Sequence, residues 1–349
     1  MRDDTTIPRA LEKGDTIALI SPSARLNELL PTGLARSEQY LESLGFHVKT
    51  IFHGPLTGTF IENIQRRVDE LHEAFTDATV KAVICTSGGS HANELVGRLD
   101  YKLIRANPKI FVGYSDITNL HGALITQAGL RTFYGPTSIP ELGTFPKPLA
   151  FTTGHLLKVL CETRKPVGAF PRSKEWARDL PSFIAGDDPS SEIPQKLSPS
   201  PTWTWLRPGK ATGRIFCGVL TSLLELAGTK YWPELNGTIL LLESSFGNNL
   251  GDPVPLAKTR SQLSQLRNMG VFEQVKGLIF GRLVGQSAEM DKDLAEILLG
   301  QCDGWTFPIL VNVDVGHTDP VLTVPVGALV RLDSEADEWV GLEPSVVRY

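Results

Sequence analysis

The stretch Lys109-Ile110-Phe111-Val112-Gly113-Tyr114-Ser115-Asp116-Ile117-Thr118 is an apolar run that stops abruptly at Ser115, and a helix-like segment, residues 119–127, follows it. A serine between a buried strand and a helix lies on a tight turn, where its hydroxyl points away from the sheet and the next backbone N–H groups can face an anion. This is the position that a nucleophilic serine would occupy. The turn lacks the Gly-x-Ser-x-Gly form, because Ile117 stands two residues after the serine. Ser115 could therefore also be a simple helix N-cap.

Strands and helices alternate around this stretch. In residues 62–75, for example, apolar residues recur every three or four positions between charged ones, as in an amphipathic helix. Alternation of strands with helices predicts an α/β fold, with a parallel sheet and helices on its faces. Besides the central stretch, we expect strands at 16–20, 47–52, 80–85 and 132–134 and helices at 34–44, 62–75 and 149–161.

The periodic pattern fades between residues 166 and 208, which are rich in proline, serine and aspartate. Because a long segment without pattern is usually a linker or a functional loop, and 349 residues suit about two domains, we interpret it as a domain junction. The prediction is an N-terminal α/β domain, 1–165, and then the junction with a C-terminal β/α domain, 166–349. There we expect strands at 213–216, 238–242, 277–280 and 309–313 and helices at 219–227, 256–269 and 291–299.

The composition is that of an ordinary globular protein, with 41% hydrophobic and 21% charged residues. The net charge is −5 and no dense block of lysine and arginine occurs, so a nucleic-acid partner is not expected. The four cysteines are far apart and form no Cys-x-x-Cys pair, and we predict no metal and no cofactor. Residues 1–6 are polar and indicate neither a signal peptide nor a membrane span, so we expect a cytoplasmic location.

A glycine pair, Gly88-Gly89, follows the predicted strand at 80–85. Glycines allow backbone N–H groups to converge on an oxyanion or a phosphate, although a lone pair of glycines is more often a tight turn. Loops at the carboxyl ends of neighbouring parallel strands share one crevice, so this loop and the Ser115 turn are expected to lie together.

An acid and a histidine follow two strands of the second domain. Glu243 ends the predicted strand at 238–242, at the sheet edge where active-site groups gather, although it could also pair with an arginine. His317 lies in a loop bounded by glycine and proline, which leaves both ring nitrogens available. A serine needs a base, the base needs a carboxylate to fix its tautomer, and the oxyanion needs donors such as the N–H groups of Gly89 and Asp116.

Three stretches also carry a resemblance to a known family. They are GGSHANEL at 88–95, NPKIFVGYSDIT at 107–118 and GHTDP at 316–320. Together they resemble the LD-carboxypeptidase family of serine peptidases, family S66, and most of all its branch related to the microcin C immunity peptidase. The resemblance covers nearly the whole chain.

The resemblance implies a Ser-Glu-His triad at the interface of two domains, with Ser115 as nucleophile, Glu243 as orienting carboxylate and His317 as base. Gly89 and Asp116 would supply the oxyanion-hole donors. It further implies a homodimer, no metal, and attack on an amide whose acyl side bears a free amino acid carboxylate or a nucleotide-linked group.

The sequence departs from that family at two places. Many relatives carry Gly-Gly-Asn where this chain has Cys217-Gly218-Val219, and residues 244–247 after Glu243 contain no basic residue for a phosphate. Trp176 stands among charged residues, so its ring is expected to be exposed, although a packing role is an equal alternative. It resembles the tryptophan that stacks on adenine in the immunity branch. It is the predicted substrate-binding residue.

Three functions are compatible with these observations. The first is a cytosolic serine peptidase that cleaves an amide in a peptidyl- or aminoacyl-nucleotide conjugate like microcin C, and the tryptophan favours it. The second is LD-carboxypeptidase action on murein tetrapeptide. The third is a non-catalytic small-molecule binding protein, which would predict a damaged triad, whereas this chain has all three members.

Overall fold

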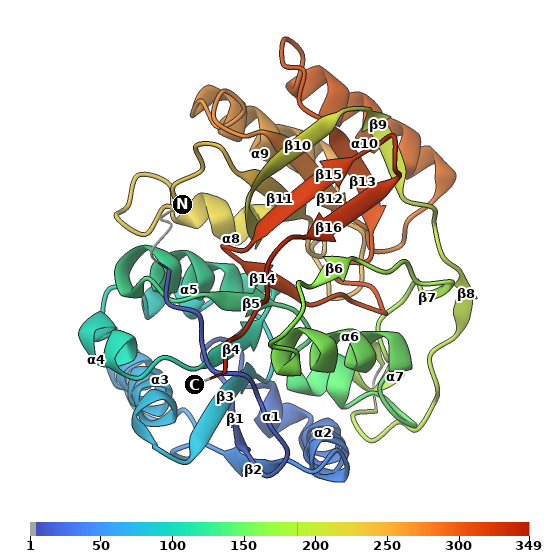
Figure 1. Cartoon of the computed structure of the whole chain (residues 1–349). Helices are drawn as coiled ribbons and strands as arrows, with labels where there is room; N and C mark the ends of the chain where they lie inside the picture. Colours follow the sequence, from blue (N-terminus) through green and yellow to red (C-terminus); the bar gives the residue numbers. More distant parts are fainter. Residues whose placement is uncertain (1–4, 187, 349) are drawn as a thin grey trace.

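The computed structural model describes residues 5–186 and 188–348, and two main sheets lie one above the other in it (Figure 1). The lower, six-stranded sheet has the order β14-β5-β4-β3-β1-β2. Its first five strands along the chain are parallel, as predicted, and β14 is antiparallel to β5. The strands are β1 (Thr16–Ile20), β2 (His47–Thr50), β3 (Val80–Cys85), β4 (Ile110–Gly113), β5 (Thr132–Tyr134) and β14 (Val324–Val326).

Helices cover both faces of this sheet because its strands are apolar on both sides. Ile84 and Val112 belong to one apolar cluster, whereas Val83 and Phe111 belong to another on the opposite face. Helices α2 and α6 contribute to the first cluster, and α3 and α5 to the second. The helices of this half are α1 (Leu26–Leu29), α2 (Pro31–Ser43), α3 (Phe60–Thr76), α4 (Tyr101–Ala106), α5 (Thr118–Ala123) and α6 (Ala150–Cys161).

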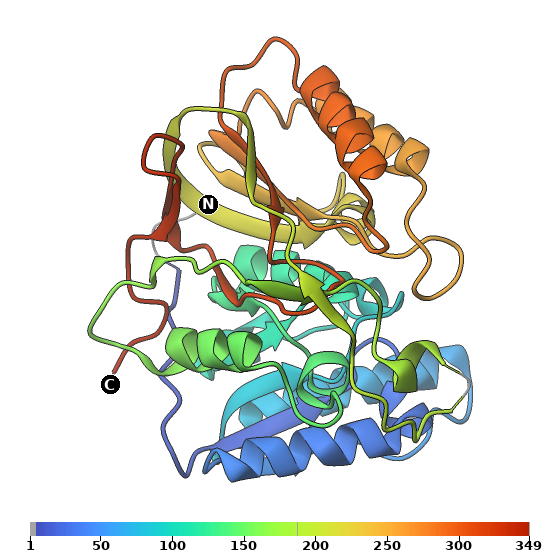
Figure 2. The same cartoon turned by 90° about the vertical axis from the view of Figure 1, so that its right-hand side faces the viewer.

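The upper, eight-stranded sheet has the order β6-β16-β15-β10-β11-β12-β13-β9. Its centre, β10 to β13, is parallel, and antiparallel strands flank it on both sides. Figure 2 shows helices α9 and α10 together on one side of this sheet. The elements are β6 (Gly168–Ala169), β9 (Thr204–Arg207), β10 (Lys210–Val219), β11 (Ile239–Glu243), β12 (Gly277–Gly281), β13 (Ile309–Val313), β15 (Leu329–Asp333), β16 (Glu338–Gly341), α8 (Leu220–Glu225), α9 (Leu256–Asn268) and α10 (Ala288–Gln301).

The segment 166–208 has more structure than its sequence predicts. It contains β6 and β9, which extend the upper sheet, a small hairpin-like sheet of β7 (Glu175–Ala177) and β8 (Leu197–Pro199), and the short helix α7 (Ser182–Ala185). These strands are too short for an apolar period to be recognised, and their partners are distant in sequence. The three C-terminal strands β14, β15 and β16 were also not predicted.

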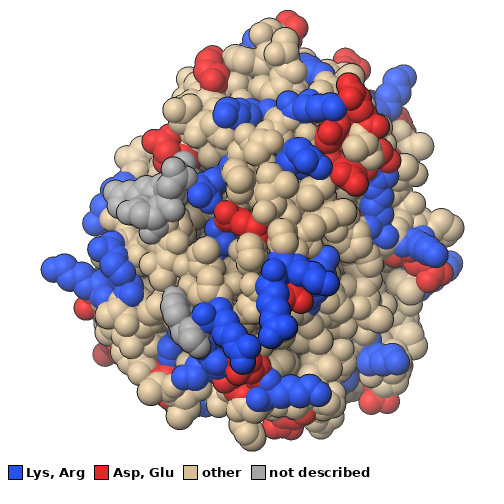
Figure 3. Space-filling model, in the orientation of Figure 1, with Lys and Arg blue, Asp and Glu red and all other residues tan. Residues whose placement is uncertain are grey.

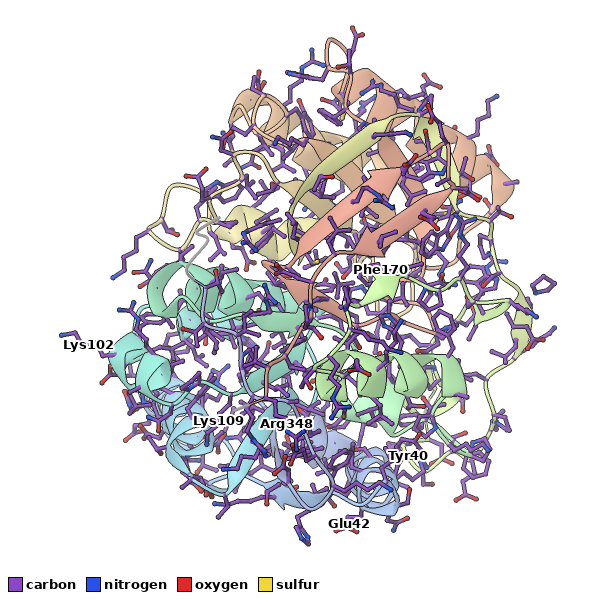
Figure 4. All side chains as sticks on the ribbon, viewed as in Figure 1. Tyr40, Glu42, Lys102, Lys109, Phe170 and Arg348 are labelled. Atoms are coloured by element: carbon purple, nitrogen blue, oxygen red, sulfur yellow. The ribbon has the colours of Figure 1, made fainter. Side chains whose placement is uncertain are left out.

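The two halves are connected at more than one place. The chain returns from the upper half to add β14 to the lower sheet, beside β5. Phe170, which Figure 4 labels where the halves meet, stacks on Trp339 of β16 at 3.8 Å and lies 5.5 Å from the ring of His155 in α6. The domain boundary at residue 165 stays a prediction.

The visible face carries mixed charge. Lys and Arg are interspersed with Asp and Glu in Figure 3, without a broad field of one sign. Within the described residues, no helix is long and apolar enough to cross a membrane. Residues 1–4 of the polar N-terminal stretch lie outside the described residues.

Candidate active site

Ser115 lies on a strained turn between β4 and α5. It opens a short 3-10 helix, Ser115–Ile117, and its backbone φ of 61° falls in the left-handed region that side chains other than glycine rarely adopt. A nucleophile on a strand-to-helix turn is commonly held in this way. The glycine loop lies directly against it, because a Cβ added to Gly88 would stand 2.7 Å from Cβ of Ser115 and 3.3 Å from the backbone nitrogen of Asp116.

His317 forms hydrogen bonds with both of its predicted partners. Its Nε2 lies 2.8 Å from Oγ of Ser115, and its Nδ1 lies 2.7 Å from Oε2 of Glu243. Glu243 is fully buried and His317 is 5% exposed. The structure therefore brings His317 together with a carboxylate 74 positions away and a serine 202 positions away in sequence. In this arrangement one ring nitrogen can accept a proton from the serine hydroxyl while the other donates to the carboxylate.

The imidazole of His317 is confined between two aromatic rings. The ring of Tyr114 lies 5.1 Å away and that of Phe246 lies 4.7 Å away in an edge-on orientation. Close approach of the histidine loop to Glu243 requires glycine, since a Cβ on Gly316, whose φ is +117°, would stand 3.1 Å from Oε2 of Glu243.

Tyr134 at the end of β5 connects the acid to the serine turn. Its hydroxyl donates to Oε1 of Glu243 at 2.6 Å and accepts from the backbone N–H of Ser115 at 3.3 Å. Burial, followed by the nearby Glu243 carboxylate, holds the pKa of Tyr134 well above its ordinary value, so the hydroxyl keeps its proton and remains a donor. The sequence analysis missed this residue. Its only signal was its place at the end of a predicted strand neighbouring β4.

A buried ion pair supports the loop that carries His317. Nη1 of Arg282 lies 3.0 Å from Oδ1 of Asp314, and Nη2 of Arg282 donates to the carbonyl of Pro320 at 2.5 Å, so both ends of the loop are held. The indole N–H of Trp203 donates to the same aspartate at 2.7 Å. Breaking such a pair would leave a buried charge uncompensated.

The carboxylate of Asp116 fixes the glycine loop beside the nucleophile. Its Oδ2 accepts hydrogen bonds from the backbone N–H groups of His91 and Ala92, at 2.9 and 2.8 Å, and from the hydroxyl of Ser23 at 2.5 Å. Asp116 therefore contributes its side chain to the support of the loop, which sequence reasoning did not anticipate. Gly88, Gly89, Ser115 and Asp116 all line one pocket.

That pocket has a volume of about 390 Å³ and opens onto Ser115 and His317. Its apolar wall comes from both halves of the chain. Leu26 and Pro140 belong to the lower half, Leu180 and Ile184 to the junction, and Phe246 to the segment after β11. A pocket of this size suits a small molecule or a short peptide.

The expectation that Trp176 is exposed is wrong. Its side chain is 6% exposed, because β7 pairs with β8 and the guanidinium of Arg282 lies 5.5 Å from the centre of its ring. In β7, Glu175 is exposed, whereas Trp176 and Ala177 are both buried. Trp176 is not among the described residues that line the pocket, and the junction contributes Leu180 and Ile184 instead.

Two further carboxyl groups are buried near the site, on Glu141 and Asp319. Glu141 accepts hydrogen bonds from the hydroxyl of Tyr114 at 2.8 Å and from the backbone N–H of Thr137 at 2.6 Å. Burial and then the charge of Asp319 raise the pKa of Glu141, and burial also raises the pKa of Asp319. The two groups thus favour a state in which one of them keeps its proton.

A serine, a histidine and a carboxylate hydrogen-bonded in series beside a pocket, on an α/β scaffold, define the class of serine hydrolases. Comparison with known proteins then identifies the family. The model of the LD-carboxypeptidase N-terminal domain matches residues 17–135, and that of the C-terminal domain matches residues 212–332. The chain belongs to the LD-carboxypeptidase family and is a serine-type peptidase.

Individual relatives support the same assignment. The chain is 31% identical to the microcin C7 self-immunity protein MccF of Escherichia coli, over 93% of this chain and 92% of that protein. It is 30% identical to a Bacillus subtilis protein named "Probable murein peptide carboxypeptidase", over 97% of this chain and 95% of that protein. A solved structure of MccF with aspartyl sulfamoyl adenosine superposes with a TM-score of 0.86 at 28% identity, covering 98% of this chain and 99% of the other.

Replacing Tyr134 with phenylalanine should lower kcat about tenfold and leave KM nearly unchanged, because the change removes one buried hydrogen bond that orients Glu243 and the Ser115 turn. Steady-state kinetics with a melting curve will check this. The control is Tyr101→Phe in α4, which removes a hydroxyl that donates to the carbonyl of Val96 and should leave kcat unchanged. A lower melting temperature with unchanged kcat would contradict the positioning role of Tyr134.

Replacing Trp176 with alanine should reduce the free energy of unfolding by about 3–5 kcal/mol, because it empties a buried site beside Arg282. Because the ring does not line the pocket, substrates with and without a nucleobase should be affected alike. Chemical denaturation of Trp176→Ala and Trp176→Phe, alongside KM for both kinds of substrate, will test this. A selective rise in KM for the nucleobase substrate at unchanged stability would restore the stacking role.

The buried carboxyl of Glu141 should make stability depend on pH. Its pKa is raised in the folded state, so the folded protein binds more protons, and the free energy of unfolding falls as pH rises above the ordinary value of 4.5. The contribution of this one group to the slope of the unfolding free energy against pH is at most about 1.4 kcal/mol per pH unit. In Glu141→Gln, which can still accept from Thr137, this slope should be reduced. Urea unfolding between pH 4.5 and 8 will measure it, and equal slopes in the two proteins would show that Glu141 is ionised in the fold.

Proposed function

We propose that this serine peptidase uses Ser115 as nucleophile, His317 as general base and Glu243 as the orienting carboxylate, and that it hydrolyses an amide in an aminoacyl- or peptidyl-nucleotide conjugate. The observation that carries the proposal is the continuous hydrogen-bonded series from Ser115 through His317 to Glu243 at the base of the pocket. Support for the nucleotide comes from MccF, which has been solved with aspartyl sulfamoyl adenosine.

In the proposed reaction, Nε2 of His317 takes the proton of Ser115 as the hydroxyl oxygen attacks the amide carbonyl. The resulting oxyanion would accept hydrogen bonds from the backbone N–H groups of Gly89 and Asp116. His317 then gives its proton to the leaving nitrogen, the C–N bond breaks, and an acyl-serine ester remains. Water, activated by the same histidine, hydrolyses the ester and regenerates the serine. Through both steps Glu243 stabilises the imidazolium and fixes its tautomer.

The second candidate is carboxypeptidase action on murein tetrapeptide. It is favoured by the similarity to the Bacillus subtilis protein named as a murein peptide carboxypeptidase. The triad would serve both substrates equally, since the two differ in the group that leaves and not in the bond that breaks. We further propose that the protein acts as a homodimer in the cytoplasm, as the family resemblance implies.

Replacing Ser115 with alanine should cut turnover by roughly 10⁴- to 10⁶-fold, because the nucleophile is lost, while circular dichroism and the melting temperature show an intact fold. The assay uses aspartyl sulfamoyl adenosine and, separately, a murein tetrapeptide, and the faster reaction identifies the substrate class. Addition of a chelator should leave the wild-type rate unchanged. Full turnover by a folded Ser115→Ala protein would refute the proposed triad.

A further inference from the structure

The pocket contains two accessible charged side chains that the proposed reaction does not use, Glu225 and Lys258. Among the described residues that line it, Lys258 is the only lysine or arginine, and Glu225 is the only carboxylate besides Asp116. Asp116 accepts hydrogen bonds from the surrounding loops, whereas Glu225 and Lys258 form no ion pair within the described residues. Both side chains reach solvent. They are therefore free to pair with a ligand.

Glu225 is held close to the serine turn. Nδ2 of Asn119 donates to Oε2 of Glu225 at 2.7 Å and to Oδ1 of Asp116 at 3.1 Å, so the two carboxylates share one donor. Desolvation by burial raises the pKa of Glu225, and the nearby Asp116 charge raises it further. Two carboxylates thus lie on this wall, and Glu225 has no ion-pair partner within the described residues. An ammonium group of the substrate placed there would offset both the desolvation of the Glu225 carboxylate and its repulsion by Asp116.

Lys258 lies on a different element, in the first turn of α9, where its backbone N–H donates to the carbonyl of Pro255 at 2.8 Å. The segment directly after β11, residues 244–247, contributes serine, phenylalanine and glycine to the pocket but no cation. A positive charge nevertheless enters the same pocket from this helix. An anionic group of the substrate would be attracted to it, since opposite charges within a partly enclosed pocket are screened less than on an open surface.

We propose that Glu225 and Lys258 bind opposite charges on one substrate, so that the enzyme selects amides that carry both a free ammonium group and an anionic group. This inference rests on the proposed function. Aminoacyl sulfamoyl nucleotides meet the requirement through the free amine of the aminoacyl group and the sulfamoyl group. Murein tetrapeptide meets it through its free amine and its terminal carboxylate. Both classes of substrate are zwitterions, so a neutral or N-blocked amide would be a poor substrate.

The ammonium part of the proposal is tested with aspartyl sulfamoyl adenosine and its N-acetyl derivative. The wild-type enzyme should hydrolyse the free amine with a KM about tenfold lower, and Glu225→Gln should raise the KM for the free amine to that of the acetylated compound. Glu289→Gln, in the exposed first turn of α10, makes the same charge change outside the pocket and should alter neither value.

The anionic part is tested with Lys258→Met. KM should rise about tenfold for murein tetrapeptide but not for its C-terminal carboxamide if the carboxylate is bound. If the sulfamoyl group is bound, KM should rise about tenfold for alanyl sulfamoyl adenosine, whose side chain carries no carboxylate. Arg260→Gln is the control, because this residue lies two positions further along α9 and lines a separate groove on the outer surface.

The outcomes separate the inference from the function on which it rests. If the wild-type protein hydrolyses none of these amides, the proposed function fails. If it hydrolyses the free amine and its N-acetyl derivative with equal KM, only the binding of opposite charges is refuted. The same holds if Glu225→Gln and Lys258→Met lower kcat for every substrate alike. A loss that affects kcat alone would indicate that Glu225 acts through Asn119 on the serine turn.

Discussion

The two hydrogen bonds of His317 are the constraint on which the rest of the structure depends. They join a serine that follows the lower sheet to a carboxylate that ends a strand of the upper sheet, so the two halves must be held in a fixed relative position. Strand β14 connects the two halves, because the chain returns from the upper half to pair this strand with β5. Tyr134, at the end of β5, then contacts the acid and the serine turn directly.

Buried polar groups, rather than apolar packing alone, set the positions of the loops around this series. The ion pair of Arg282 and Asp314 holds the histidine loop, and the Asp116 carboxylate holds the glycine loop. Removing such charges from water is costly, and the cost is offset only when their hydrogen bonds are satisfied in one arrangement. That requirement favours a single geometry at the site.

The elements that hold Ser115, Glu243 and His317 differ from several of those that line the pocket. Ser115, Glu243 and His317 lie at or just after strand ends, where backbone hydrogen bonding fixes them. Part of the pocket wall comes instead from the junction, from the segment after β11 and from the first turn of α9. Such segments can change without disturbing the triad, because they carry few of its hydrogen bonds. This separation allows relatives named for microcin immunity and for murein cleavage to share one fold.

The sequence by itself determined the α/β class, the parallel strands of both halves and the family, because these depend on local periodicity and on short motifs near strand ends. It also singled out Ser115, Glu243 and His317, since each stands where a predicted strand stops. Only the tertiary structure decided that Trp176 is buried, that Tyr134 bridges the acid and the serine turn, and that Lys258 enters the pocket. Those outcomes depend on contacts between residues far apart in the chain, which no local pattern encodes. The short strands of 166–208 and the return of β14 to the lower sheet escaped prediction for the same reason.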